Sequence, residues 1–433
     1  MIKFFKKLFR DRRGNALIIA GAALPLVIGS AGLASDTIQW ALWKRQLQRA
    51  ADSAAIAGVY AHVQSASVND AVNRDLVHNS HVGIATTVNT TNPPTVGGYT
   101  SDPHAVRVAL AVQKRLSFSG MFMSAAPTIR ATATATIVPS GEYCVISLEP
   151  TAATGITATG NADVNMGCGM ITNSISMTAA VATGSSLVRA SPIAAVGGIA
   201  ASNNWASGTI LQPFTLAQED PFASVPAPST FPTGNCPNFR VNSNVTKTSL
   251  DSSDTNTQNL PSGTHCVGNM DLQGTVTLPS GSTFILDGGS LTIGAQARVT
   301  CLQCTFVLTS RNADTNPSSI GNVDINGGAE VDLSAPSSGT YKGIMIYQDR
   351  RAVDGTSANQ QSKLNGNSES SFQGAFYFPS QQVTYNGTAG MTTTCMQLVA
   401  RRVYYSGNMN ISNSCPTNSG ASSFAGKKVR LVE

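Results

Sequence analysis

Residues 292–299 read TIGAQARV and residues 324–331 read DINGGAEV, and this pattern decides the fold. Each segment has a short strand, a glycine-centred turn, a small residue or Met, one further residue and an apolar residue. The pattern recurs, more loosely in the last case, in TATGNADV (157–164), TYNGTAGM (384–391), YYSGNMNI (404–411) and KLNGNSESSF (363–372). The turn glycines Gly366, Gly387 and Gly407 are 21 and 20 residues apart. One short strand and one turn about every 20 residues is typical of a parallel β-solenoid.

Stacking explains why such a repeat folds. One coil cannot bury its own apolar positions, whereas stacked coils pair their backbones about 4.8 Å apart and align Val, Ile, Leu and Phe into one core. A β-sandwich is the alternative, but its turns recur about every 8–12 residues. The repeat fades near residues 203–262, where a proline-bearing stretch, VPAPS (225–229), predicts a linker or a loop across the solenoid. We therefore expect a β-solenoid (β-helix-like) domain over residues 142–433.

Composition excludes several classes of protein. Only 12% of the 433 residues are charged, against roughly 25% in an average soluble protein, which argues against a coiled coil or a charged disordered chain. Residues 1–13 hold six Lys or Arg and one Asp, which accounts for the whole net charge of +5. Because the basic groups form one short tail and the rest is neutral, we expect no nucleic-acid partner.

An uncharged apolar segment follows the basic tail. Residues 15–35 are long enough to cross a bilayer as a helix, and the cations before them predict that residues 1–14 stay in the cytoplasm. Pro25 lies within the segment and is tolerated in a membrane helix. A cleaved signal peptide, with Gly32-Leu33-Ala34 as a loose cleavage site, is the alternative. Both interpretations predict that the rest of the protein is exported.

Residues 36–141 predict a stalk helix followed by a small β module. Apolar positions recur at spacings of three and four from Asp36 to about Tyr60, which indicates that the membrane helix continues outward. Residues 104–116 and 129–138 then alternate apolar and polar side chains as strands do. The stalk could pack on its own domain or on a partner's helix, and the sequence leaves both open.

The segment from residue 12 to 61, RRGNALIIAGAALPLVIGSAGLASDTIQWALWKRQLQRAADSAAIAGVYA, resembles the amino-terminal module of TadG-like proteins of the tight-adherence (Flp-type) pilus system. Segments around Asp220-Pro221, Gly343–Arg350 and Gly374–Pro379 extend the likeness. The residues that match the family motif are Arg13, Gly14, Asn15, Pro25, Asp36, Leu47, Gln48, Ala50, Ala51 and Asp52. Prepilins of this system carry a Glu five residues after the cleaved Gly, but position 19 is Ile here, so no prepilin processing is expected.

The resemblance implies a non-enzymatic, single-pass component of the bacterial inner membrane. Its carboxyl-terminal domain would face the periplasm, or the cell surface after export, as a scaffold for pilus assembly. The implied partners are the inner membrane and other pilus components, such as pseudopilins and the secretion platform. Two alternatives remain: a membrane-tethered solenoid that acts on or binds envelope polysaccharide, and a secreted adhesin released by signal cleavage.

All eight cysteines lie beyond the membrane segment, and an even number in an oxidising compartment predicts disulfides. Short loops suggest that neighbours in the sequence pair, although eight cysteines allow 105 connectivities. The suggested pairs are Cys144–Cys168, Cys236–Cys266, Cys301–Cys304 and Cys395–Cys415.

Chemical motifs are sparse. Paired carboxylates of the kind that hydrolyse glycosidic bonds could come from Asp287, Asp324, Glu330 and Asp332. The cluster Asp349-Arg350-Arg351 fits an ion pair at a coil edge better than a catalytic arginine, and Asp251–Thr255 lacks the buried strand that a metal-binding adhesion motif requires. We therefore expect no catalytic residues, no bound metal and no cofactor.

Overall fold

The computed structural model describes residues 14–79, 87–231, 236–242, 246–247, 262–355, 361–367, 369–386, 390–393, 395–407, 410–413 and 424–433. The chain forms two units, an amino-terminal unit of Met1–Val138 with Lys428–Glu433, and a solenoid unit of Pro139–Lys427. The sequence placed the whole of residues 142–433 in the solenoid. The structure differs at the last six residues, because Thr134 exchanges backbone hydrogen bonds with Val432 and Glu433.

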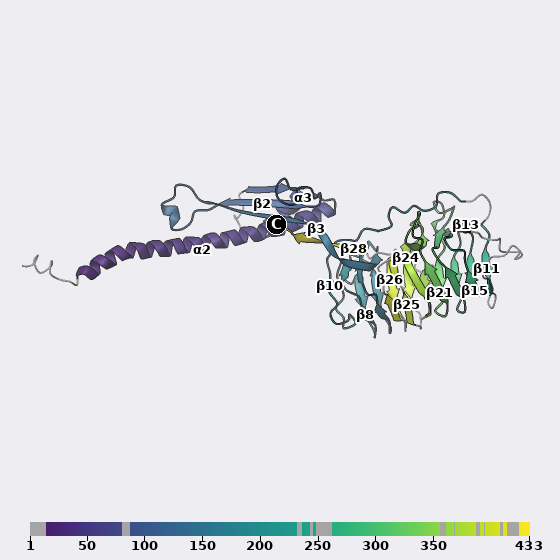
Figure 1. The fold of residues 1–433 in the computed structure, drawn as a ribbon. Helices are drawn as coiled ribbons and strands as arrows, with labels where there is room; N and C mark the ends of the chain where they lie inside the picture. Colours follow the sequence, from purple (N-terminus) through teal and green to yellow (C-terminus); the bar gives the residue numbers. More distant parts are fainter. Residues whose placement is uncertain are drawn as a thin grey trace, which may run out of the picture. The chain divides into compact units, whose positions relative to one another are not determined.

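The amino-terminal unit packs helices on a small antiparallel sheet. Strand β2 pairs with β1 on one side and with the first part of β3 on the other. The unit's elements, drawn in Figure 1, are α2 (Gly14–Val63), α3 (Val68–Asn79), β1 (Thr87–Thr91), β2 (Val106–Gln113), the short 3₁₀ helix η1 (Ser119–Met121), the start of β3 (Thr128–Ser147) and the end of β28 (Phe424–Leu431). The helix-plus-sheet module expected after the membrane segment is present.

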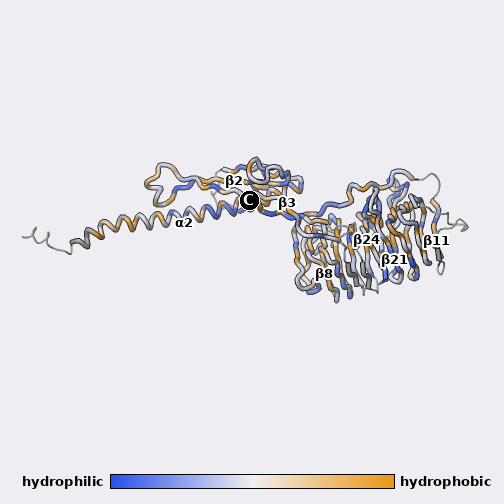
Figure 2. Tube along the Cα trace, viewed as in Figure 1, coloured by the Kyte–Doolittle hydropathy of each residue, from blue (hydrophilic) through white to orange (hydrophobic). Residues whose placement is uncertain are grey.

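The two halves of α2 differ in burial. From Leu47 onward its small and apolar side chains pack against α3 and the sheet, in a core that includes Val108 and Leu110 of β2. From Ile19 to Leu33 its large apolar side chains are exposed, and Figure 2 shows this part of the helix coloured mostly as hydrophobic. The stalk part of α2 therefore packs on its own domain, one of the two arrangements that the sequence left open.

The solenoid unit is built of parallel strands that stack coil on coil. The elements that stack in sequence order are β11 (Phe239–Val241), β12 (Thr246–Lys247), β13 (Thr264–Val267), β14 (Met270–Leu272), β15 (Thr275–Thr277), β16 (Thr283–Asp287), β17 (Leu291–Ile293), β18 (Arg298–Cys301), β19 (Thr305–Thr309), the 3₁₀ helix η2 (Pro317–Ser319), β20 (Val323–Ile325), β21 (Glu330–Ser334), β22 (Ile344–Gln348), β23 (Ser362–Leu364), β24 (Ser371–Tyr385), β25 (Gly390–Thr393), β26 (Cys395–Tyr405) and β27 (Asn410–Asn413). The mainly-β fold with a solenoid-like parallel sheet is thereby confirmed.

The repeat segments found in the sequence stack in register. Their first residues form one column of successive backbone partners: Thr292, Asp324, Lys363, Thr384, Tyr404 and Thr157. The next residues, which include Ile293, Ile325 and Tyr405, are all buried. The spacing of the column is not constant in the sequence, because loops such as the one that carries η2 lengthen some coils.

The order of stacking departs from the order of the chain. β26 pairs on one side with β24, and on the other with the end of β3 and with β4. The strands that continue the stack from there are β4 (Ile156–Ala158), β5 (Asp163–Asn165), β6 (Gly169–Thr172), β7 (Ala180–Ala182), β8 (Leu187–Arg189), β9 (Ile193–Ala195) and β10 (Leu211–Gln212). The first coils in the sequence thus follow the last ones in space, at a place that we call the junction.

Residues 213–231, which we call the return segment, connect β10 at one end of the stack to the chain leading to β11 at the other. The segment follows an apolar face of the solenoid, where Phe222, Val225 and Phe231 pack against a buried cluster that includes Tyr347 and Tyr377. The loop across the solenoid expected from the prolines is therefore present.

Candidate functional site

Asp36 fixes a loop of the amino-terminal unit to α2. Its carboxylate accepts hydrogen bonds from the backbone N–H groups of Phe118 (2.9 Å) and Ser119 (2.5 Å), where η1 begins. The side chain is 3% exposed. One turn earlier, a Cβ on Gly32 would lie 2.3 Å from the Phe118 ring, so a larger residue there would displace the ring. The acidic residue of the family motif therefore holds the β2–β3 loop on the helix.

The other motif residues dock α2 on the sheet. Leu47, Ala50 and Ala51 are buried, which brings the helix close to the strands. Gln48 donates hydrogen bonds to Asp52 (2.8 Å) and to the backbone carbonyl of Thr132 on β3 (2.9 Å). The Leu-Gln-x-Ala-Ala-Asp run thus builds a helix–sheet contact and needs no ligand to explain it.

The remaining motif positions lie in the first half of α2. Gly14 and Asn15 begin the helix and Pro25 lies inside it, whereas Arg13 falls outside the described residues. In the described part of the chain, one helix is apolar and long enough to cross a membrane, over Ile19–Val63, and only 6% of its most apolar window is buried. This arrangement is compatible with a single membrane span near the amino terminus.

Residues 14–64 match the model of the Tad family, described as putative Flp pilus-assembly TadE/G-like. We call these residues the Tad domain, after the family model that they match. The match covers the whole of α2 and one residue beyond it. It supports both the TadG-like assignment and involvement in Flp (tight-adherence) pilus assembly. No curated protein and no solved structure matches the chain.

Beyond the Tad domain, a buried ionic cluster holds the junction of the solenoid. Glu149, which follows β3, is 0% exposed and accepts hydrogen bonds from Arg401 (3.0 Å) and Arg402 (2.6 Å) of β26. Thr151 donates two more, and Arg402 also pairs with Asp354 at 2.5 Å. Burial alone would raise the pKa of Glu149, but these hydrogen bonds lower it to about 2. The carboxylate therefore stays ionised and ties early coils to late ones.

A second polar cluster fastens the return segment. Tyr377 donates its hydroxyl proton to Asp220 at 2.6 Å, and Tyr347 donates to the carbonyl of Val225 at 3.2 Å. Arg350 donates to the carbonyls of Phe222 and Val225 and lies over the Tyr377 ring. Burial raises the pKa of Tyr347 to about 12, so its hydroxyl keeps the proton that it donates.

The cysteines that the structure describes are all oxidised. The pairs Cys144–Cys168, Cys236–Cys266 and Cys301–Cys304 are present as the short-loop argument suggested. Cys395 is also disulfide-bonded, but Cys415 lies outside the described residues.

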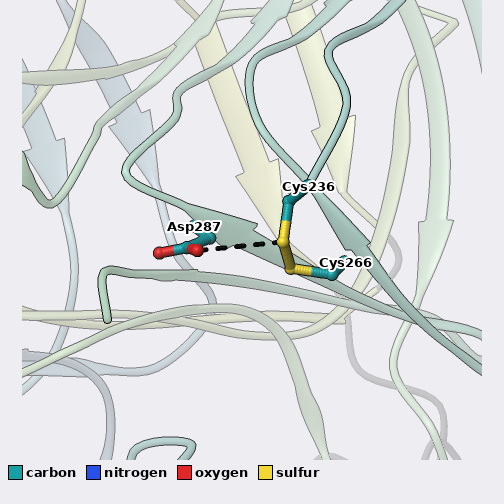
Figure 3. A group of neighbouring side chains, drawn as sticks. All are labelled: Cys236, Cys266 and Asp287. Carbon is teal, nitrogen blue, oxygen red and sulfur yellow. Dashed lines mark hydrogen bonds between the residues drawn. A yellow bond between two sulfur atoms is a disulfide. The ribbon is translucent and has the colours of Figure 1, made fainter. Parts of the chain in front are cut away.

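The Cys236–Cys266 disulfide lies beside Asp287 (Figure 3), and the three side chains come close enough together to resemble a metal-ligand set. Two observations weigh against that use. Both thiols are bonded to each other, and Asp287 pairs with Arg311, which donates its backbone N–H to the same carboxylate at 2.8 Å. The group is better explained as a crosslink with an adjacent ion pair.

Of the acidic residues considered for glycoside hydrolysis, Asp324, Glu330 and Asp332 lie on the consecutive strands β20 and β21, and Asp287 lies on β16. Most of them face cations. Asp324 pairs with Lys363 at 3.6 Å, Glu330 pairs with Arg298 at 3.1 Å, and Asp332 lies on β21 beside Thr300 and Ser371 of neighbouring strands. These ion pairs join neighbouring coils.

Asp349 is buried and accepts hydrogen bonds from Thr309 and Arg351, which is the coil-edge ion pair that the sequence favoured over a catalytic arginine. The segment Asp251–Thr255 lies outside the described residues.

Sequence reasoning missed the partners of the ionic clusters and one helix. Glu149 and Arg402 are 253 residues apart, and no local pattern links them. The missed helix, α3, did carry a signal, since the backbone N–H of Asp70 donates to the hydroxyl of Ser67 at its start, and serine is a favoured capping residue.

Proposed function

We propose that the protein is a single-pass inner-membrane component of the tight-adherence pilus machinery that acts as a non-enzymatic periplasmic scaffold. Residues 1–14 would remain in the cytoplasm, α2 would cross the membrane, and the solenoid unit would stand in the periplasm. The observation that carries this proposal is the Tad match over residues 14–64, which coincides with a helix whose first half is apolar and uncovered.

The chemistry of the solenoid supports a scaffold. Parallel coils give a long, regular surface that can present many contact points, and buried ionic clusters and disulfides stiffen it. The candidate acidic residues mostly pair with arginine or lysine of adjacent coils. Pseudopilins and the secretion platform are the partners that we propose for this surface.

Topology is tested with alkaline phosphatase, which is active only after export, fused after Glu433. Activity in the intact strain, together with recovery of the full-length chain in the inner-membrane fraction, is expected. An inactive fusion or a chain found in the cytosol would refute the anchoring. A mature amino terminus beyond residue 34, read by mass spectrometry, would instead favour the secreted adhesin.

The role in assembly is tested in a deletion strain. Full-length protein should restore pili and surface attachment. A variant in which a cleavable signal peptide replaces residues 1–35 should not restore them, because the solenoid would be released from the membrane. Unchanged piliation in the deletion strain would contradict the proposal.

The enzymatic alternative is separated by incubating the purified full-length protein with envelope polysaccharides. Intact polymer is expected, whether or not it binds. Release of new reducing ends would identify a polysaccharide-degrading enzyme and displace the scaffold proposal.

A further inference from the structure

The loop between β2 and β3 exposes large apolar side chains that its own unit does not cover. Met121 is 70% exposed, Phe122 77% and Met123 46%. The three are consecutive, and the Phe122 ring packs edge-on against Phe118 with a centroid distance of 5.5 Å. Such a cluster at the tip of one loop indicates a contact with an apolar surface.

The loop is held at a defined position along α2. Asp36 binds the N–H groups of Phe118 and Ser119, and the Phe118 ring lies over Gly32. Figure 1 shows the loop extending beyond the sheet alongside the helix. A span of about 20 residues that starts at Asn15 ends near residue 34. Phe118 therefore contacts the last turn of the apolar span.

α2 also exposes apolar side chains near the point where Phe118 contacts Gly32. Leu33 is 58% exposed, Ile38 61% and Trp40 44%. Tryptophan is enriched at membrane–water interfaces because its indole is partly polar. Helix and loop thus present apolar side chains to one layer, at the boundary between acyl chains and headgroups.

The base of the loop is cationic and its backbone is satisfied. Lys114 and Arg115 precede the apolar tip, and the Lys114 ammonium lies 5.4 Å from the centre of the Trp43 ring. The N–H groups of Gly120, Met121, Phe122 and Met123 all bond carbonyls within the loop. Internally bonded backbone lowers the cost of leaving water, and cations beside an apolar tip suit anionic headgroups.

We propose that the β2–β3 loop is a second membrane contact, which inserts Met121, Phe122 and Met123 into the outer leaflet of the bilayer that α2 spans. The inference rests on the membrane anchoring proposed above. With two contacts instead of one, the amino-terminal unit would be held against the membrane and restrained from rotating about α2.

The experiment uses the full chain in nanodiscs that contain anionic lipid. The described cysteines are all paired, so an introduced thiol can be labelled selectively with an environment-sensitive fluorophore. Three single variants are compared: Phe122→Cys in the loop, Leu26→Cys in the span and Val96→Cys as the control. Val96 is 57% exposed and its carbonyl accepts a hydrogen bond from Arg107, at the opposite end of β2 from the loop.

Lipids that carry a quencher in the acyl chain should reduce the fluorescence at positions 122 and 26 and leave position 96 unchanged. Quenching at 26 without quenching at 122 would overturn the membrane-contact inference and leave the anchor intact, as expected if the loop instead binds a protein. Absence of quenching at 26 would refute the anchor and this inference together. Met121→Cys repeats the loop measurement in case Phe122→Cys misfolds.

Discussion

Glu149 is a fully buried carboxylate whose partners come from the far end of the chain. Removing one member of a buried, hydrogen-bonded charge cluster strongly destabilises the fold, because the remaining buried charges are left without an opposite charge. Its folded-state pKa of about 2 lies below the ordinary value of 4.5. Ionisation of this residue therefore stabilises the fold above about pH 4.5, and the stabilisation is lost as the pH falls toward 2.

Glu149→Gln should lower the free energy of unfolding at pH 7 by about 3 kcal/mol, the equivalent of the pKa difference. The deficit should shrink as the pH is lowered from 4.5 toward 2, because in this range the carboxylate of the unfolded wild-type chain takes up a proton while that of the folded chain stays ionised. Urea unfolding at pH 7 and pH 3 measures both values. Glu219→Gln is the control, since this carboxylate is 82% exposed in its pair with Lys427. An equal deficit at both pH values would contradict the assignment.

Gly160 tests the corner geometry of the coils. Its φ is +66°, and a Cβ there would lie 3.1 Å from the backbone nitrogen of Gly407 in the next coil. Gly208 has a φ of +86° but open space around it. Gly208→Ala should therefore cost about 1 kcal/mol from backbone strain alone. Gly160→Ala should lower the melting temperature more than Gly208→Ala does, because its Cβ would also meet the backbone of Gly407. Equal decreases in melting temperature for the two variants would contradict this argument.

At the level of elements, local patterns carried most of the predictive power. The period-two alternation of residues 104–116 and the glycine turns identified strands because both patterns reflect burial within one element. The helix–sheet contact of Leu47, Ala50 and Ala51 was recognisable only as a motif, since its partners on β2 and β3 lie far away in the sequence. The hydrogen bonds between Asp36 and the β2–β3 loop likewise could not be predicted from the sequence, because they join residues more than 80 positions apart.

The return segment offers an element-scale prediction. Arg350→Met removes the donors to the carbonyls of Phe222 and Val225 and should release the segment while leaving the coils intact. Limited proteolysis should then cleave within residues 213–231 faster than in wild type, with an unchanged far-ultraviolet circular dichroism spectrum. Arg240→Met is the matched control, because this arginine pairs with Asp271 on the coil surface. Equal cleavage rates would show that the segment is held by packing alone.

At the scale of the whole molecule, the repeat predicted the register but not the order of the coils. Six segments fall into one column, yet the step from Tyr404 to Thr157 runs backward along the chain. A sequence repeat indicates that the coils have equivalent structures, but it does not indicate which coils lie next to each other. The fourth cysteine pairing stays a prediction.

The junction can be tested directly by a new disulfide. Neighbouring strands lie about 4.8 Å apart, which suits a disulfide, whereas strands two coils apart are too distant. Thr157→Cys with Tyr404→Cys should form a bond detectable by peptide mapping. Thr157→Cys with Thr384→Cys should not, because Tyr404 stands between them. A bond in the second pair alone would refute the order of coils.

The backward step at the junction bears on how the polypeptide becomes folded. The end of β3 and β4 can pair with β26 only after residues 395–405 have left the ribosome and passed the secretion channel. Until then they present an unpaired edge, which is the kind of surface that aggregates. The coils early in the sequence can therefore complete their strand pairing only after the late coils have been synthesised and exported.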